Sequence, residues 1–328
     1  MPPPRFTIAI PAYKAKFLRE AIQSVLDQTF PDFELIIVND ASPEDLDSIV
    51  RTFSDPRIHY FVNERNCGAV EVVDNWNRCL AHASGTYFLC MGDDDRLLSS
   101  CLADYKTLIE HHPGLGVYHA WTQIINDQGD IVRMQEPRPE VESVYSLIWN
   151  RWKGRDQFIG DFLFDTAWLK THGGFFKLPY AWGSDDITAV MAATPSGIAN
   201  LQVPAFQYRV HATTISESTP CEHFMNAIDL EEAWFVHFLA ASASSPVATI
   251  TAVFRKMCVE ARAQYFSNRR QQTVANDIET HGPFRFLYWL RPRHRHGLRL
   301  SQIFFCGLLG IRQAFHRRRL AKHQDCSP

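Results

Sequence analysis

The chain has 328 residues, 46% of them hydrophobic and 21% charged, with a formal net charge of −3. This composition is typical of a globular protein with a substantial core, and the charge gives no overall sign of nucleic-acid binding. No run reaches the roughly 18 apolar residues of a membrane-spanning helix, the N-terminal segment has no signal-peptide core, and the eight cysteines form no CxxC pair. We therefore expect a cytoplasmic, soluble or peripheral protein with reduced thiols and without a zinc site.

Residues 5–91 alternate between predicted strands and helices. Strands are predicted at 5–10, 33–40, 57–63 and 86–91, and the second is almost entirely apolar, as in a parallel sheet buried on both faces. Helices are predicted at 16–29, 42–53 and 69–83, the second beginning with Ser42 as its cap and Pro43 at the first helical position. This order predicts an α/β fold with an open, mostly parallel sheet flanked by helices.

The second half of the chain is predicted to become progressively more helical. A helix at 100–113, a strand at 116–126, a turn at 127–130 and a helix at 141–152 are followed by a strand and a short helix within 160–175, then a helix from 185. Residues 197–211 indicate an edge strand, because Pro204 interrupts them. Helices at roughly 222–243 and 247–268 are predicted to be joined by a short linker at 242–246.

Polar or turn-forming residues follow each of the first four strands, at 11–13, 39–40, 63–66 and 92–95. Ligands of open α/β sheets bind at the carboxyl ends of the strands, so these four ends predict one site. Its most unusual part is a run of three aspartates, Asp93, Asp94 and Asp95, directly after a buried strand. Carboxylates held together lose hydration and repel one another, and a divalent ion with a diphosphate offsets both effects. The alternative is a solvated acidic turn before a helix.

The chain resembles glycosyltransferase family 2, whose members have the GT-A fold. The resemblance is carried by residues 8–42, by residues 63–95 ("NERNCGAVEVVDNWNRCLAHASGTYFLCMGDDD"), by "WGSDD" at 182–186 and by "YRVHATTIS" at 208–216. It covers about two thirds of the chain. It implies an inverting transfer of a sugar from a nucleoside diphosphate, with Mn²⁺ or Mg²⁺ on the diphosphate.

The resemblance also implies roles for individual residues around the donor. The positions that match the family's nucleotide site are Pro11, Ala12, Tyr13, Asp40, Asn66, Gly68 and Asp93. Among them, the carboxylate of Asp40 is expected to accept a hydrogen bond from the imide N–H of uracil. Metal binding is expected from Asp94, Asp95 or Asp93, and the sequence leaves open which of them holds the ion. Gly92 stands where many members have the first aspartate of a D-x-D motif.

A general base is expected in "YAWGSDDITAVMAA", because an inverting transfer needs a group that removes the proton of the acceptor hydroxyl. The family usually has Glu-Asp here, at the start of a helix. This chain has Asp185 and Asp186, and either register is open, with a slight preference for Asp186. Both residues are also suited to the N-terminus of a helix, and the two roles are compatible.

Four further residues are predicted at the site by the same resemblance. Arg209 or His211 is expected to reach the diphosphate and steady the charge of the leaving group, and His211 is alternatively a metal ligand. Trp182 is a candidate wall of the acceptor site, with a core position as the alternative. Asp161 lies in the stretch where family members place acceptor-side residues.

Arginines and aromatic residues are interleaved in the last 45 residues of the chain. The positions concerned are Arg291, Arg293, Arg295, Arg299, Arg312 and Arg317–Arg319 together with Phe284, Phe286, Tyr288, Trp289, Phe304, Phe305 and Phe315. This pattern suits contact with an anionic membrane surface, and the alternative is a helical tail with a solvated basic face.

The sequence therefore predicts a GT-A domain at 1–216, with a nucleotide-binding half at about 1–100 and an acceptor half at about 101–216, and a helical region at 217–328. We expect an inverting hexosyltransferase that uses a nucleoside-diphosphate sugar, with UDP as the expected nucleotide. Its acceptor is a glycan or a lipid-linked sugar in the assembly of a bacterial surface polysaccharide, on the inner face of the cytoplasmic membrane. The alternatives are a nucleotidyltransferase, although the loop after strand one lacks its glycines, and a non-catalytic protein that binds nucleotide sugars.

Overall fold

The computed structural model describes residues 3–211, 221–241 and 249–324, except for the side chains of residues 222 and 314–324. Outside this description lie the predicted linker at 242–246, residues 212–216 of the family segment, and the side chains of Phe315 and Arg317–Arg319. The chain divides into two compact units: Met1–Glu217 with Ala248–Phe254, and Ser218–Val247 with Arg255–Pro328. Each unit is described by itself.

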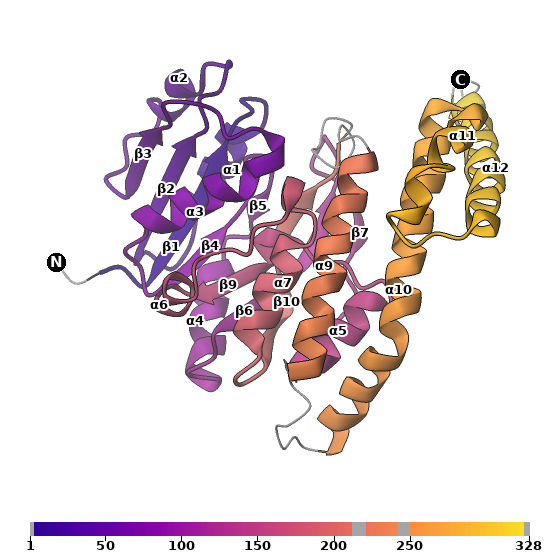
Figure 1. Cartoon of the computed structure of the whole chain (residues 1–328). Coiled ribbons are helices and arrows are strands. Elements are labelled where there is room, and N and C mark those ends of the chain that lie inside the picture. The colour runs from indigo at the N-terminus through magenta and orange to yellow at the C-terminus, as the bar shows by residue number, and fades with distance from the viewer. Residues whose placement is uncertain (1–2, 212–220, 242–248, 325–328) are drawn as a thin grey trace. The chain divides into compact units, whose positions relative to one another are not determined.

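The first unit is built on one mixed sheet, shown in Figure 1. Its strands run in the order β3-β2-β1-β4-β9-β6-β10-β5, with β7 beside β6 and β8 beside β10. β1 to β4, β6 and β10 are mutually parallel, and β9 is inserted antiparallel between β4 and β6. The bounds are β1 Phe6–Ala12, β2 Phe33–Asn39, β3 Ile58–Val62, β4 Tyr87–Cys90, β5 Arg96–Leu97, β6 Val117–Ile125, β7 Ile131–Met134, β8 Val141–Glu142, β9 Phe162–Asp165 and β10 Ile198–Arg209.

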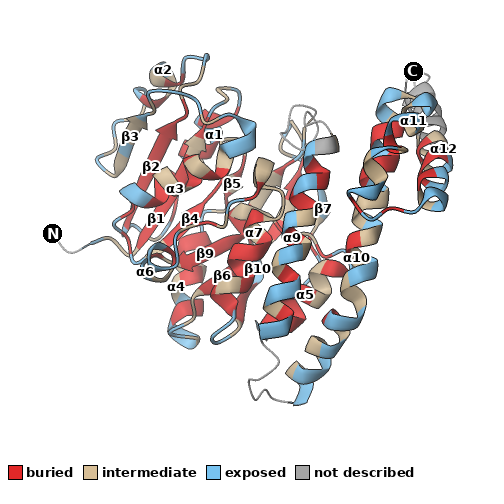
Figure 2. Ribbon diagram, in the orientation of Figure 1, coloured by how far each residue is buried: buried red, intermediate tan, exposed pale blue. Residues whose placement is uncertain are grey.

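Helices cover both faces of this sheet, whose strands are mostly buried in Figure 2, because successive strand side chains point to opposite faces and both sets are apolar. Ile8 and Ile10 pack with α1 and α4 in one core, and on the opposite face Trp76 of α3 contacts Phe175, which also contacts Phe88 of β4. The helices are α1 Leu18–Leu26, α2 Leu46–Val50, α3 Val72–His82, α4 Cys101–His111, α5 Val144–Trp152, α6 Thr166–Thr171 and α7 Ser184–Ala193. This confirms the predicted open, mostly parallel α/β sheet.

Among the elements of this unit that differ from the prediction, two differ for a clear local reason. Ser42 does not cap α2, because its hydroxyl donates to the carbonyl of Tyr13; Asp45 accepts from the Ser48 amide instead, and the helix is short. The segment with Pro204 is one twelve-residue strand, β10, and not an edge strand ended by the proline. Its pairing with β6 shifts register on both sides of Pro204, so the proline lies at a bulge, where it needs no ladder hydrogen bond.

The second unit is helical. It contains α9 Cys221–Ala241, most of α10 Thr249–His281, α11 Phe286–Trp289 and α12 Leu300–Gln324, with short 3₁₀ turns η5 Pro283–Arg285 and η6 Pro292–His294. α10 is longer than predicted because Val274, Ala275 and Ile278 continue its apolar stripe into a core with Trp289 and Ile303. It ends at Gly282, whose φ of +93° suits glycine.

In the described part of the chain no helix is long and apolar enough to cross a bilayer, and the described cysteines form no disulfide.

A buried carboxylate ties the strands together at the amino end of the sheet. Glu34 of β2 accepts hydrogen bonds from the Thr7 hydroxyl, from the Ser84 amide and hydroxyl, and from the Gly85 amide. Burial by itself raises the pKa of Glu34, but these four donors outweigh it and hold the pKa below its ordinary value of 4.5. A side chain at position 85 has no room, since a Cβ would lie 2.6 Å from the Thr7 amide nitrogen.

We expect the Glu34→Gln variant to lose about 2 kcal/mol of unfolding free energy at pH 7, because charged hydrogen bonds are replaced by neutral ones. A carboxylate whose pKa is depressed by folding stabilises above its unfolded pKa, and this contribution disappears as the pH falls through the lower folded value. Urea unfolding between pH 7 and pH 3.5 should therefore show a smaller loss of stability for Glu34→Gln than for the wild type. The exposed Glu136→Gln is the control, and equal pH profiles for Glu34→Gln and the wild type would contradict this account.

Candidate active site

The carboxyl ends of β1, β2 and β3 are aligned, because Ala12 pairs with Asn39 and Asn39 with Val62. β4 ends earlier: Cys90 pairs with Ala9, and the Met91 amide donates to the Ala9 carbonyl. The turn at 92–95 consequently passes beside the last residues of β1. This stagger is the reason why the three aspartates meet the loop that follows the first strand.

Asp93 is held by that loop. Its Oδ2 accepts from the backbone amides of Tyr13 and Lys14, both at 2.7 Å. Burial and the neighbouring Asp94 raise its pKa to about 6, in spite of the two amide donors. The two amides point at Asp93 and do not form the open phosphate cradle that a nucleotidyltransferase would need.

Asp95 is buried, and its two oxygens are used within the fold. Oδ1 accepts from the Arg209 amide at 2.9 Å, and Oδ2 accepts from the Gly92 amide at 3.2 Å. Burial and the charge of Asp94 raise its pKa well above the ordinary value. A Cβ at Gly92 would lie 2.7 Å from an oxygen of Asp94 and 2.9 Å from one of Asp95. In this chain the turn is therefore packed around a glycine, and Asp95 fits a structural role better than the metal-binding role predicted for it.

Asp94 is the aspartate with a carboxylate oxygen left for a ligand. Its side chain is 19% exposed, and Oδ2 lies 2.7 Å from Nε2 of His211, which follows β10. Its Oδ1 accepts no hydrogen bond from the described residues. The His211 ring also contacts the Phe17 ring, which fixes its orientation. A carboxylate oxygen beside an imidazole nitrogen is a pair suited to a divalent ion.

Arg209 is not placed for the role predicted for it, because its guanidinium is buried and four of its five N–H groups donate within the protein. It donates from Nε to the Asp94 carbonyl at 2.8 Å, from Nη1 to the carbonyls of Asn126 and Asp127, and from Nη2 to Glu20 at 2.8 Å. It also lies 4.0 Å above the Phe17 ring and is 1% exposed. Arg209 holds the acidic turn in place, and because it is buried its one remaining N–H group is not accessible to a diphosphate. No pattern in the sequence indicated its partner Glu20, which is 189 positions away.

Asp40 organises the loop after β3. Its carboxylate accepts from Nδ2 of Asn63 at 2.7 Å and from the amide of Cys67, and Arg78 lies 3.7 Å away. The turn predicted at Asn66 and Gly68 is present: the Asn66 side chain accepts from the Gly68 amide, and Gly68 has a φ of +75°. A carboxylate has about four lone-pair positions, so Asp40 keeps acceptor capacity for a base edge.

Asp185 and Asp186 lie at the N-terminus of α7, as predicted, but in different surroundings. Asp186 is buried and accepts from Arg151 Nε at 2.9 and 3.0 Å and from Gln157 Nε2 at 2.8 Å. Asp185 is half-buried and has no ion pair or hydrogen bond to another side chain within the described residues, while a backbone hydrogen bond from Asp186 acts to lower its pKa. Burial and then the charge of Asp186 raise the pKa of Asp185 to about 8, and Arg151 opposes the rise. These surroundings favour Asp185 over Asp186 as the candidate base, whereas the sequence gave a slight preference to Asp186.

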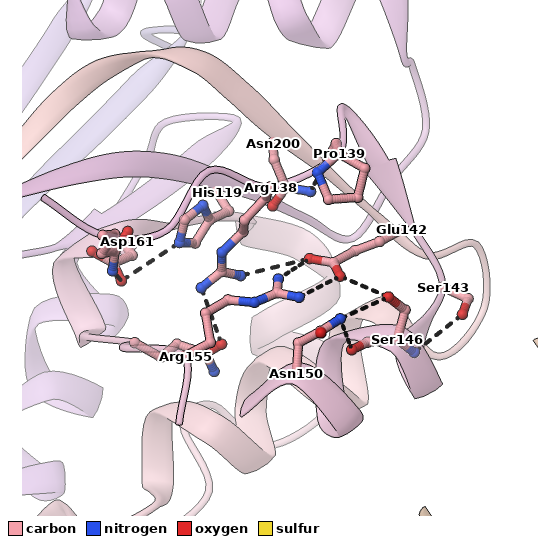
Figure 3. Close-up of polar contacts among 12 residues, drawn as sticks. His119, Arg138, Pro139, Glu142, Ser143, Ser146, Asn150, Arg155, Asp161 and Asn200 are labelled. Carbon is pink, nitrogen blue, oxygen red and sulfur yellow. Dashed lines mark hydrogen bonds and ion pairs between the residues drawn. The ribbon is translucent and has the colours of Figure 1, made fainter. Parts of the chain in front are cut away.

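A buried network supports this corner of the domain, as Figure 3 shows. Arg151 donates to the Arg155 carbonyl, and Arg155 pairs with Glu142 at 2.7 and 3.2 Å. Arg138 lies 3.8 Å from Glu142, and burial followed by the charge of Arg155 lowers its pKa to about 10. Removing one member would leave an unpaired buried charge, so the network fixes α5 and the start of α7 firmly.

Asp161 is not available to an acceptor. It is fully buried, and its carboxylate accepts from the Thr122 hydroxyl, from Gln135 Nε2 and from the Phe158 amide. His119 lies 3.5 Å away, and burial lowers the pKa of this imidazole to about 4. Asp161 is therefore a core residue in this fold, which its sequence neighbourhood did not indicate.

Strained backbone lies beside two of the predicted site carboxylates. In the described part of the chain, the non-glycine residues with positive φ are Ala41 directly after Asp40, and Tyr180 and Ala181 shortly before Asp185. Residues held in this way persist only where the surrounding structure compels them, and they concentrate at functional sites. Trp182 follows the second group and is half-buried, next to Gly183 at the start of α7.

Tyr208 links the two acidic groups. Its ring stacks on Phe158 at 3.7 Å, and burial together with the charges of Asp95, Asp94 and Asp185 raises its pKa. The pKa of this one side chain is therefore raised by carboxylates of both the acidic turn and the start of α7. Tyr208 begins the family segment "YRVHATTIS", but the sequence predicted no role for it.

Comparison with known proteins agrees with this geometry. A sequence model described as "Glycosyl transferase family 2" matches residues 7–175, just over half of the chain. A GalNAc(5)-diNAcBac-PP-undecaprenol beta-1,3-glucosyltransferase of Campylobacter jejuni is 35% identical over 103 residues, 30% of this chain and 33% of that protein. The putative colanic acid biosynthesis glycosyl transferase WcaA of Escherichia coli is 36% identical over 115 residues, 33% of this chain and 40% of that protein. The chain thus spans well under half the length of these relatives.

The fold is shared with a solved structure. The chain is similar to residues 1–349 of TarS from S. aureus in complex with UDP-GlcNAc, with a TM-score of 0.60 and 16% identity. The similarity covers 90% of this chain and 93% of that one. At this level of identity the likeness establishes the fold, which is the GT-A fold.

We expect Arg209→Lys to lower the unfolding free energy by roughly 3 kcal/mol, because an ammonium cannot replace a buried, forked guanidinium that donates to several oxygens. The matched control is Arg96→Lys, since Arg96 also reaches Glu20, at 3.4 Å, but is partly exposed. Urea unfolding of both variants measures the difference. Equal losses in the two variants would show that Arg209 does not hold the acidic turn.

Proposed function

Because the chain belongs to glycosyl transferase family 2 and has the GT-A fold, we propose that it is a glycosyltransferase that uses a nucleoside-diphosphate sugar, with UDP as the expected nucleotide. We propose that it moves the sugar to a glycan or lipid-linked acceptor in bacterial surface polysaccharide assembly. The observation that carries the proposal is the convergence of two carboxylate groups. The acidic turn follows β4 and Asp185 lies at the start of α7; Tyr208, which stacks on Phe158, has a pKa raised by burial and by the charges of both groups.

The donor nucleotide would lie over the carboxyl ends of β1, β2 and β4. Tyr13 is 41% exposed at the end of β1 and can border the base, while Asp40 offers acceptor positions to the imide N–H of uracil. Pro11 and Ala12 shape this loop, and Asn66 and Gly68 form the turn beside Asp40. Asp93 stands between this loop and the acidic turn, which is the position expected for contact with the ribose.

The residues present fit a divalent ion at Asp94. Its Oδ1 has no protein donor among the described residues, and His211 offers a nitrogen next to Oδ2. Neither at this turn nor elsewhere in the described chain is there a group of three or more His, Cys, Asp or Glu side chains that could hold a metal ion, so an ion here would have at most two protein ligands. This suits Mg²⁺ or Mn²⁺, which is commonly bound by one or two protein ligands and completed by substrate phosphates. When bound, such an ion would offset the charge of the diphosphate leaving group.

The reaction we propose is a single displacement with inversion. The acceptor oxygen attacks the anomeric carbon, the bond from that carbon to the diphosphate oxygen breaks, and Asp185 takes the proton of the attacking hydroxyl. Asp186 cannot serve equally well, because both of its oxygens accept from Arg151. Arg151 and Gln157 thereby position the first turn of α7, and Trp182 is a candidate wall for the acceptor sugar.

The site of action is proposed from the relatives and from the second unit. The named substrate of the Campylobacter relative carries an undecaprenol diphosphate, so a lipid-linked acceptor at the inner face of the cytoplasmic membrane is a reasonable partner for this chain also. Peripheral contact with an anionic membrane would bring the enzyme to such an acceptor.

The donor proposal predicts a ligand-dependent thermal shift. UDP with Mn²⁺ should raise the melting temperature by several degrees at about 100 times its dissociation constant, which corresponds to about 2.7 kcal/mol of stabilisation. The shift should be lost with a chelator and in Asp94→Asn. It should persist in Asp32→Asn, an exposed residue preceding β2 at the amino end of the sheet. A UDP shift that is indifferent to chelator and to Asp94→Asn would contradict the metal assignment.

The mechanism predicts distinct effects at the two aspartates of α7. Asp185→Asn should lower kcat by about 10²–10⁴-fold while the UDP-dependent thermal shift is retained, because a general base is removed without touching the nucleotide. Asp186→Asn should instead lower the unfolding free energy, because it leaves Arg151 without its carboxylate partner. Sugar transfer and urea unfolding measure the two effects. A larger loss of kcat in a well-folded Asp186→Asn than in Asp185→Asn would reverse the assignment.

The same assignment fixes the sign of the pH dependence. A carboxyl group with a pKa of about 8 is protonated and inactive as a base at lower pH, so kcat/KM should rise with pH and level off above about 8. Arg151→Gln removes a charge that lowers the pKa of Asp185, so it should move this rise to higher pH.

A further inference from the structure

Large apolar side chains are exposed on one helical hairpin of the second unit. The hairpin consists of η5 and α11 on one side and α12 on the other, and the segments are in contact, with Phe286 and Phe304 ring centroids 6.0 Å apart. Phe284 is 81% exposed and Leu308 is 71% exposed. We call the exposed apolar set the hairpin surface; its members are Phe284, Leu287, Tyr288, Leu300, Phe304, Phe305 and Leu308.

The hairpin surface is not an unfinished part of the core. α12 turns Ile303 and Cys306 inward onto α10, and Gly310 allows close approach, since a Cβ there would lie 2.5 Å from the Ala275 carbonyl. Leu300, Phe304 and Leu308 repeat every four positions, are exposed, and so form a stripe on another side of α12. The helix is therefore apolar on both sides, and only one side is covered.

The charge of this segment has one sign. Residues 283–313 contain six arginines and no aspartate, glutamate or lysine. Within the described structure, the ion pairs from this segment to acidic residues are those of Arg285 with Asp277 and of His296 with Asp229. The exposed Arg291, Arg295, Arg299 and Arg312 accompany the hairpin surface without an acidic partner among the described side chains.

We propose that the hairpin surface docks on an anionic lipid bilayer, with its aromatic and leucine side chains at the boundary between head groups and acyl chains and its arginines on the lipid phosphates. Exposed Phe, Tyr and Leu beside Arg is the composition of an interfacial helix, and α12 does not meet the requirements of a spanning one. A nucleic acid would meet the arginines but leave the apolar stripe in water. A second copy would bring two basic hairpins together, which like-charge repulsion opposes.

This inference rests on the membrane contact proposed above and names the surface that makes it. It is independent of the sugar transfer. Each arginine near an anionic surface strengthens binding by roughly fivefold, and this attraction is screened by salt.

Vesicle co-sedimentation of the full chain tests the proposal. The wild type should bind vesicles of phosphatidylglycerol mixed with phosphatidylcholine and should bind pure phosphatidylcholine at least tenfold more weakly. Phe304→Ser with Leu308→Ser should reduce vesicle binding at least tenfold. Arg295→Gln with Arg299→Gln should also reduce vesicle binding, and the reduction should be larger at low salt than at high salt. The matched control is Ile131→Ser with Val132→Ser on β7, two apolar residues of similar exposure, 53% and 56%, in the first unit.

Several outcomes would overturn the proposal. They are no binding of the wild type to anionic vesicles, equal loss in the β7 control, or a wild-type dimer that Phe304→Ser with Leu308→Ser converts to a monomer without any vesicle binding. The UDP-dependent thermal shift, measured on the same variants, should be unchanged, because the substitutions lie outside the nucleotide site. A variant that loses vesicle binding but keeps the UDP-dependent thermal shift would show that the hairpin surface acts separately from the nucleotide site. A wild type without the UDP-dependent shift would contradict the proposed function and leave the membrane proposal unaffected.

Discussion

The site depends on one constraint, which is the cost of keeping several carboxylates out of water at the end of a buried strand. Three consecutive aspartates cannot all be charged, buried and unpaired. The fold gives each aspartate a different environment. Asp93 accepts hydrogen bonds from two loop amides, and Asp95 accepts hydrogen bonds from the amides of Arg209 and Gly92. Asp94 is partly exposed beside His211. Two of the three therefore build the turn, and the third remains for a ligand.

Arg209 makes this division possible. A guanidinium buried over Phe17 and hydrogen bonded to the Asp94 carbonyl places a permanent positive charge beneath the acidic turn, where it stabilises the turn without entering the ligand side. Its bond to Glu20 ties the turn to the first helix of the domain. The residue that the sequence suggested as a ligand for phosphate is thus better understood as the support on which the acidic turn rests.

The start of α7 repeats the same solution with two carboxylates. Asp186 is paired with Arg151 and Gln157, while Asp185 keeps a carboxyl group without a side-chain partner among the described residues. Tying one carboxylate down makes its neighbour harder to ionise, because the fixed negative charge lies close by in a poorly solvated corner. The ion pair of Asp186 and the raised pKa of Asp185 are consequently two results of the same arrangement.

The sequence predicted what depends on local pattern and failed where partners are distant. The first four strands and the helix start at Asp185 follow from periodicity, turn residues and the family resemblance, and they lie within about two residues of the predicted positions. The choice between Asp185 and Asp186 depends on Arg151, some 35 positions earlier, and the role of Arg209 depends on Glu20, 189 positions earlier. Asp161 differs from Asp94 only in what surrounds it: Thr122, Gln135 and Phe158 saturate it within the core. Residue type identifies the carboxylates, whereas the number of donors that reach each one decides whether it serves the fold or a ligand, and that number exists only in the folded chain.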